Sequence, residues 1–94
     1  MLNQVILVGR VADMFNEEMV IRVPDTNKKT EDDIIPVSIV GNIGKNVKEY
    51  CHEGDIIGIK GKLKAKGNSL IVAAEKVTFL SSKTTEEDSN NERG

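Results

Sequence analysis

Residues 55–79 read DIIGIKGKLKAKGNSLIVAAEKVTF, with runs of strand-forming character on either side of Gly67-Asn68. Glycine and asparagine both accept positive φ, so such a pair is typical of a two-residue turn between antiparallel strands. Valine and isoleucine favour the pleated, packed surface of a sheet. The stretch therefore predicts a hairpin with strands over Asp55–Lys66 and Ser69–Phe79.

Lysine alternates with a small or apolar residue along the first of these strands. Because successive side chains of a strand point to opposite faces, the lysines share one face and stand roughly 6.6 Å apart. That spacing is close to the distance between phosphates of an extended single strand, so the face predicts a nucleic-acid-binding site. The candidate residues are Lys60, Lys62, Lys64 and Lys66, with Arg10 and Arg22 of other strands as additional candidates.

The competing interpretation is a solvated face whose lysines only deter edge-to-edge aggregation. Counting back from the turn gives the expected cross-strand neighbours: Lys66 with Ser69, Lys64 with Ile71, Lys62 with Ala73 and Lys60 with Glu75. Only Lys60 then has an opposite charge across from it. Three lysines without such a partner favour a polyanionic ligand.

Three further strands and one helix are expected before the hairpin. The strands are predicted at Asn3–Val11, Met19–Val23 and Ile34–Val40, with Pro36 at an edge or bulge of the third. The residues with helical spacing are Ile43, Val47, Tyr50 (expected to be half-buried) and Cys51, and Gly54 is the expected left-handed residue that ends the helix. This is the order of an all-β, five-stranded OB barrel with one short helix between strands 3 and 4.

The chain has 94 residues and only three aromatic side chains, which predicts one domain with an aliphatic core. The formal net charge is −2. Two basic and four acidic residues follow residue 80, so residues 1–80 hold 11 of each sign and are neutral overall. Residues 81–94 contain no apolar side chain and predict a disordered acidic tail after an OB-fold domain over residues 1–80.

Several classes of function are not expected. The sequence shows no nucleophile with a base, no paired carboxylates in an apolar setting and no complete phosphate loop, so we do not expect an enzyme. One cysteine and one histidine are too few for a zinc site, and no cofactor is expected. No stretch of about 20 apolar residues or basic leader is present, which favours a cytoplasmic protein without membrane contact.

Three blocks of sequence carry a resemblance to a known family: NQVILVGR at 3–10, IPVSIVG at 35–41 with NVKEY at 46–50, and Gly54-Asp55 leading into GKLK at 61–64. Together they resemble the bacterial single-stranded DNA-binding protein family over residues 1–80. The resemblance implies an OB-fold that binds single-stranded DNA in replication, repair or recombination, with Lys64 and Lys66 matching residues that contact the DNA backbone.

The resemblance also implies partners. Members of the family self-associate through the first strand, and here a homodimer is expected rather than a tetramer. The expected interface residues are Asn3, Val5, Ile6, Leu7 and Val8. Replication proteins such as helicase or primosome components are further expected partners.

The sequence departs from the family in its aromatic residues. The third-strand stacking positions hold Ile34 and Val40, and the long hairpin loop is reduced to Gly67-Asn68. Binding should therefore depend mainly on backbone charge and on salt. The same departures resemble the primosomal replication protein of replication restart, so the alternative is a protein-interaction module that binds single-stranded DNA weakly. A third hypothesis is an assembly domain without a DNA role.

Overall fold

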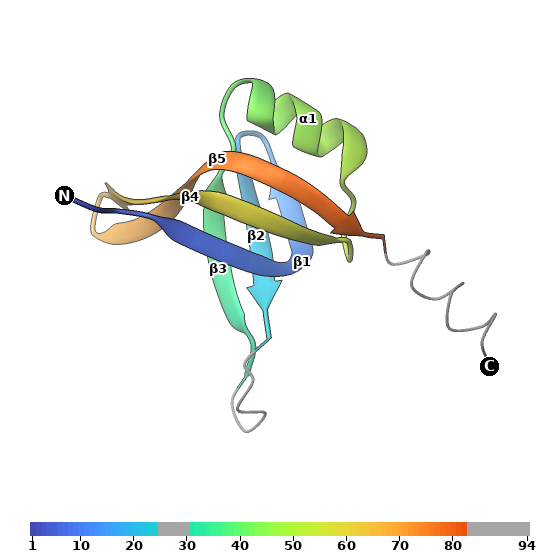
Figure 1. Cartoon of the computed structure of the whole chain (residues 1–94), viewed down its shortest axis with the longest axis horizontal. Helices are drawn as coiled ribbons and strands as arrows, with labels where there is room; N and C mark the ends of the chain where they lie inside the picture. Colours follow the sequence, from blue (N-terminus) through green and yellow to red (C-terminus); the bar gives the residue numbers. More distant parts are fainter. Residues whose placement is uncertain (25–30, 83–94) are drawn as a thin grey trace.

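The computed structural model describes residues 1–24 and 31–82. Five strands wrap into a closed barrel in the order β1-β2-β3-β5-β4, and one helix packs at its end (Figure 1). The elements are β1 (Val5–Phe15), β2 (Glu18–Val23), β3 (Asp33–Ser38), α1 (Asn42–Tyr50), β4 (Ile56–Lys66) and β5 (Ser69–Ser81). The predicted five-stranded OB-fold, with its helix between the third and fourth strands, is confirmed.

The expected tail begins inside the last strand. Ser81, the first residue of the expected tail, is the last residue of β5, and from residue 83 on that tail lies outside the described residues. In the part of the chain that the structure describes, no helix has the length and apolar character needed to cross a membrane.

The core of the barrel is aliphatic, as predicted. Its largest fully buried side chains are Met19, Ile21, Val37, Ile39, Ile57 and Ile59. All three aromatic side chains lie on the surface instead. Tyr50, expected to be half-buried, is exposed because Gly44 and Val47 occupy the buried side of α1.

The strand β1 continues four residues beyond its predicted end at Val11. The register between β1 and β2 shifts between Val11 and Asp13, as in a β-bulge, and pairing then continues to Phe15 opposite Glu18. Asn16, with φ 51°, begins the two-residue turn to β2. The bulge allows a stretch of mixed polarity to remain in the sheet and carries Phe15 to the end of the barrel.

The hairpin of β4 and β5 turns at Gly67-Asn68, as predicted, and three of the four expected cross-strand pairs are present. The fourth, Lys60 with Glu75, is wrong. The register shifts between Lys60 and Gly61, so that Glu75 is an extra residue on β5 and Lys60 lies opposite Lys76. Gly61 permits this shift because a Cβ atom there would collide with the carbonyl oxygen of Ala73.

Two smaller predictions have different outcomes. Pro36 lies in the part of β3 that pairs with β2 alone, as expected for a residue without an N–H. Gly54 has the expected positive φ of 93°, but it does not end the helix. The helix already ends at Tyr50, where Cys51 adopts an extended conformation and donates its N–H to Val47. Gly54 belongs to the turn that leads into β4.

Candidate nucleic-acid interface

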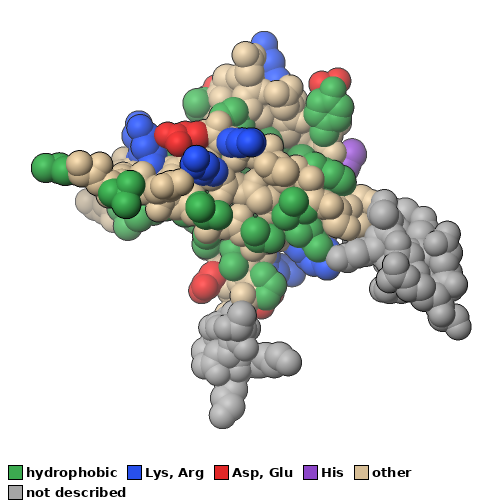
Figure 2. All heavy atoms as spheres, viewed as in Figure 1, with side chains coloured by type: hydrophobic (Ala, Val, Ile, Leu, Met, Phe, Trp, Pro, Cys, Tyr) green, Lys and Arg blue, Asp and Glu red, His purple; other side chains and the backbone are tan. Residues whose placement is uncertain are grey.

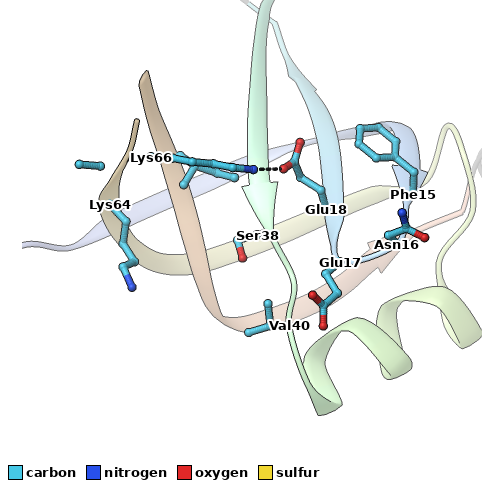
Figure 3. A pocket seen from close by; sticks show the side chains of 10 residues that line it. Phe15, Asn16, Glu17, Glu18, Ser38, Val40, Lys64 and Lys66 are labelled. Atoms are coloured by element: carbon cyan, nitrogen blue, oxygen red, sulfur yellow. Dashed lines mark hydrogen bonds and ion pairs between the residues drawn. The ribbon is translucent and has the colours of Figure 1, made fainter. Parts of the chain in front are cut away.

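An open groove of about 550 Å³ lies between the β1–β2 turn and the tip of the β4–β5 hairpin. Figure 3 shows side chains of both hairpins on its two sides, with the end of β3 between them. The lining residues are Phe15, Asn16, Glu17, Glu18, Ser38, Val40, Lys64, Ala65, Lys66 and Ile71. Oligonucleotides bind OB-folds at the face of strands 2 and 3 and at these two connecting loops, so the groove is the candidate site.

One aromatic ring lies at this groove. Phe15 is 45% exposed, and a ring in such a position can stack a nucleobase. Phe15 lies four residues beyond the predicted end of the first strand, so no binding role was expected for it. Of the two apolar residues expected at the stacking positions, Val40 lines the groove and Ile34 does not.

The four lysines of β4 are all exposed; Lys62, Lys64 and Lys66 alternate along a regular stretch of the hairpin, and the register shift separates Lys60 from them. Lys64 and Lys66 line the groove, whereas Lys60 lines a separate hollow beside β1 and Lys62 lines neither. The twist of the strand and the register shift at Gly61 account for this separation. Within residues 1–24 and 31–82, Lys60, Lys62 and Lys64 have no ion pair.

Lys66 forms an ion pair with a carboxylate, so the prediction that it has no such partner is wrong. Its Nζ lies 2.7 Å from Oε2 of Glu18, and Figure 3 shows this side chain extending across the groove while Lys64 points away. The partner belongs to β2, 48 residues earlier in the chain. Counting cross-strand pairs within one hairpin could not reveal it.

Arg10 and Arg22 lie opposite one another across β1 and β2, away from the groove. Arg22 is four residues from Glu18 along β2, or about 13 Å at the usual rise of a strand. Arg10 Nη1 donates to the carbonyl of Gly54 at 2.8 Å, and Arg22 Nε lies 3.9 Å from Oδ2 of Asp32. The structure therefore does not bring the predicted arginines and lysines into one site.

The expected interface residues of β1 divide between two faces. Val5 and Leu7 pack against the core, whereas Ile6 and Val8 are 71% and 53% exposed. Leu80 of β5 is exposed as well and lies over Gly58, which pairs with Val8. Figure 2 shows hydrophobic side chains spread over this face of the barrel. We call Ile6, Val8 and Leu80 the β1 patch.

Asn3, the remaining expected interface residue, contacts the hairpin. Its Nδ2 donates to the carbonyl of Leu63 at 2.9 Å, and its Oδ1 accepts from the N–H of the same residue at 3.0 Å. The Asn3 side chain thus makes the two hydrogen bonds that the backbone of a paired strand residue would make. It extends the contact between β1 and β4 beyond Val5.

A third hollow, of about 230 Å³, separates α1 from β5 and is bordered by Tyr50 and Phe79. Cys51 lies at its base, where burial and then the nearby carboxylate of Asp55 raise the pKa of the thiol. The Asp55 carboxylate also accepts a hydrogen bond from the N–H of His52 at 2.8 Å, which holds the turn after the helix.

No protein-family model matches the chain. Single-stranded DNA-binding protein 1 of Clostridium acetobutylicum is 35% identical over 71 residues, an alignment that covers 66% of this chain and 64% of the relative. The chain therefore spans slightly less than two thirds of that relative's length.

Solved structures resemble the barrel more completely. The mitochondrial single-stranded DNA-binding protein Rim1 of S. cerevisiae superimposes with a TM-score of 0.72 at 16% identity, covering 87% of this chain and 99% of Rim1. The SSB domain of a Synechococcus sp. protein gives 0.70 at 17% identity, covering 83% and 96%. The small single-stranded DNA-binding protein of Streptomyces coelicolor gives 0.63 at 17% identity, covering 85% and 94%.

The sequence resemblance and the fold agree, while the primosomal alternative gains no support from these relatives. The chain has the OB-fold of single-stranded DNA-binding proteins and resembles one of them in sequence over about two thirds of its own length.

Proposed function

We propose that this protein binds single-stranded DNA, as a non-enzymatic component of replication, repair or recombination in the cytoplasm. The observation that supports this most is the groove between the β1–β2 turn and the β4–β5 hairpin, with Lys64 and Phe15 on its walls. The name of the Clostridium relative supports the same ligand.

The chemistry of the groove suits a nucleic-acid backbone with one stacked base. Lys64 lines the groove, and Lys62 precedes it by two residues on β4. Both are exposed and carry no ion pair within the described residues, so their ammonium groups can each replace the counterions of a phosphate. Phe15 offers a ring that any base can stack on. With neutral charge over residues 1–80, attraction at a distance is weak, and local contacts must supply the affinity.

The test is the salt dependence of binding to a fluorescently labelled oligothymidine. We expect the affinity to fall as salt rises, and the double variant K62A/K64A to weaken binding at low salt and to flatten the logarithmic slope by about 1.4, since each lost contact to a single strand contributes about 0.7. The control K45A/K48A removes the same charge from exposed positions of α1. Equal effects of the two pairs would refute a specific lysine contact.

The proposed assembly is a homodimer formed through β1. The β1 patch exposes apolar side chains that a single chain leaves in water. In addition, β2 pairs with β1 only from Arg10 onward, so within residues 1–24 and 31–82 no strand pairs with residues 5–8 of β1 on that side. A second β1 pairing at this edge would extend the sheet and place the two patches side by side.

A second candidate function is a protein-interaction module with weak DNA binding, as in the primosomal interpretation. The position of Tyr50 and Phe79 favours it, because both exposed rings border the hollow between α1 and β5 rather than the groove. Tight capture of a helicase or helicase loader, lost in Y50A and combined with millimolar DNA affinity, would favour this function over the first.

A further inference from the structure

The ion pair between Lys66 and Glu18 joins the two sides of the groove. Glu18 is the first residue of β2 and Lys66 the last residue of β4, so the contact links the β1–β2 turn to the tip of the hairpin (Figure 3). The side chain of Glu18 is only 27% exposed, which limits the positions that its carboxylate can occupy. At 2.7 Å the contact is a short, charge-assisted hydrogen bond.

The groove as a whole has no net charge. Its charged lining residues are Lys64, Lys66, Glu17 and Glu18, two of each sign. A phosphate that approaches Lys66 must therefore displace a carboxylate that is already in place. Displacement exchanges one charge-assisted contact for another and leaves Glu18 unpaired beside a polyanion.

We propose that Glu18 withholds Lys66 from nucleic acid, so that the ion pair is an intramolecular competitor of a phosphate in the groove. The inference rests on the proposed function, because it concerns the same site. Glu18 then helps to set the affinity for DNA and its salt dependence. In the wild-type protein, Lys62 and Lys64 are the cations that contact the DNA backbone.

The slope of the logarithm of affinity against the logarithm of salt concentration distinguishes this competition from general repulsion between acidic residues and DNA. Removing any acidic residue strengthens attraction to DNA, but the slope counts the cations that contact phosphates. Releasing Lys66 from Glu18 adds one such contact. For a single strand, each contact changes the logarithmic slope by about 0.7.

The experiment measures binding of labelled oligothymidine over a salt series for E18Q, K66A and E18Q/K66A. E18Q keeps the shape of the side chain and is expected to bind about three- to fivefold tighter at low salt, as a surface ion pair of usual strength predicts. Its slope should steepen by about 0.7, whereas K66A and E18Q/K66A should retain the wild-type slope. E49Q, at an exposed position of α1, is the charge-matched control and should leave the slope unchanged.

The outcomes separate this proposal from the proposed function. A wild-type slope in E18Q overturns the competition, provided that K62A/K64A still flattens the slope. A flatter slope in K66A would also overturn it, because Lys66 would then contact DNA despite Glu18. Failure of the wild-type protein to bind oligothymidine at low salt would instead refute the proposed function and this inference together.

Discussion

Lys60 and Lys76 lie directly opposite one another on β4 and β5, next to the register shift at Gly61. Like charges in cross-strand positions destabilise a sheet, and no carboxylate forms an ion pair with either lysine in the described part of the chain. The bulge therefore places two cations together where the sequence pattern predicts a pair of opposite charge.

Replacing Lys76 with glutamate should stabilise the barrel. We expect K76E to raise the free energy of unfolding by about 0.5–1 kcal/mol at low salt, because a repulsive cross-strand pair becomes attractive. Urea titration at low and high salt measures the change, which should shrink as ions screen the pair. K62E makes the same change of charge opposite Ala73, and equal stabilisation by that variant would show that cross-strand pairing is irrelevant.

Replacing Phe15 with alanine should weaken DNA binding without changing its salt dependence. Base stacking on an aromatic ring contributes about 1–3 kcal/mol and involves no phosphate. We therefore expect F15A to lower the affinity for oligothymidine at every salt concentration while the slope stays that of the wild type. F79A removes another exposed ring, one that borders the hollow at α1, and should bind normally. If both variants bind equally well, Phe15 does not stack a base.

Replacing Ile6 with glutamate should abolish self-association. The side chain is 71% exposed in the single chain, and the proposed dimer would take a carboxylate there out of water, a cost that pairing with Lys60 across β1 and β4 offsets only in part. Sedimentation at micromolar concentration should show a dimer for the wild type and a monomer for I6E. L70E tests a similarly exposed apolar residue of the β4–β5 hairpin and should remain dimeric. A monomeric wild type would contradict the proposed interface.

Local signals explain which parts of the fold the sequence predicted correctly. The turn at Gly67-Asn68 and the helical spacing of Ile43 and Val47 involve residues close together in the chain, and both features are present. The order of these elements was then sufficient to identify the barrel. Strand ends were less accurate, because the bulge after Val11 depends on pairing with β2 rather than on any local pattern.

The candidate site was only partly predictable for the same reason. Period-two alternation correctly indicated exposed lysines on β4, but it assumed a straight, regular ladder. Contacts between distant segments changed the outcome: Glu18 pairs with Lys66, and Phe15 enters the groove only because β1 continues through its bulge. Such contacts depend on how the barrel closes, which hydrophobic patterning along one strand does not encode.

Gly61 should be the glycine of β4 that tolerates substitution least. A Cβ atom there would collide with the backbone carbonyl of Ala73, which cannot move without disturbing the β4–β5 pairing at the register shift. We expect G61A to lower the free energy of unfolding by about 1–3 kcal/mol, the usual cost of overpacking.

The matched variant is G58A, three residues earlier in the same strand. A Cβ at Gly58 would lie 3.7 Å from Leu80 Cδ1, an ordinary packing distance. Alanine restricts the unfolded chain more than glycine does, which favours the folded state. This gain should offset any small loss in packing, so the stability of G58A should stay close to that of the wild type. Thermal and urea unfolding of the two variants measure the difference. Equal stabilities would mean that the β5 backbone shifts freely at Ala73, and the close approach at Gly61 would then not be what permits the register shift.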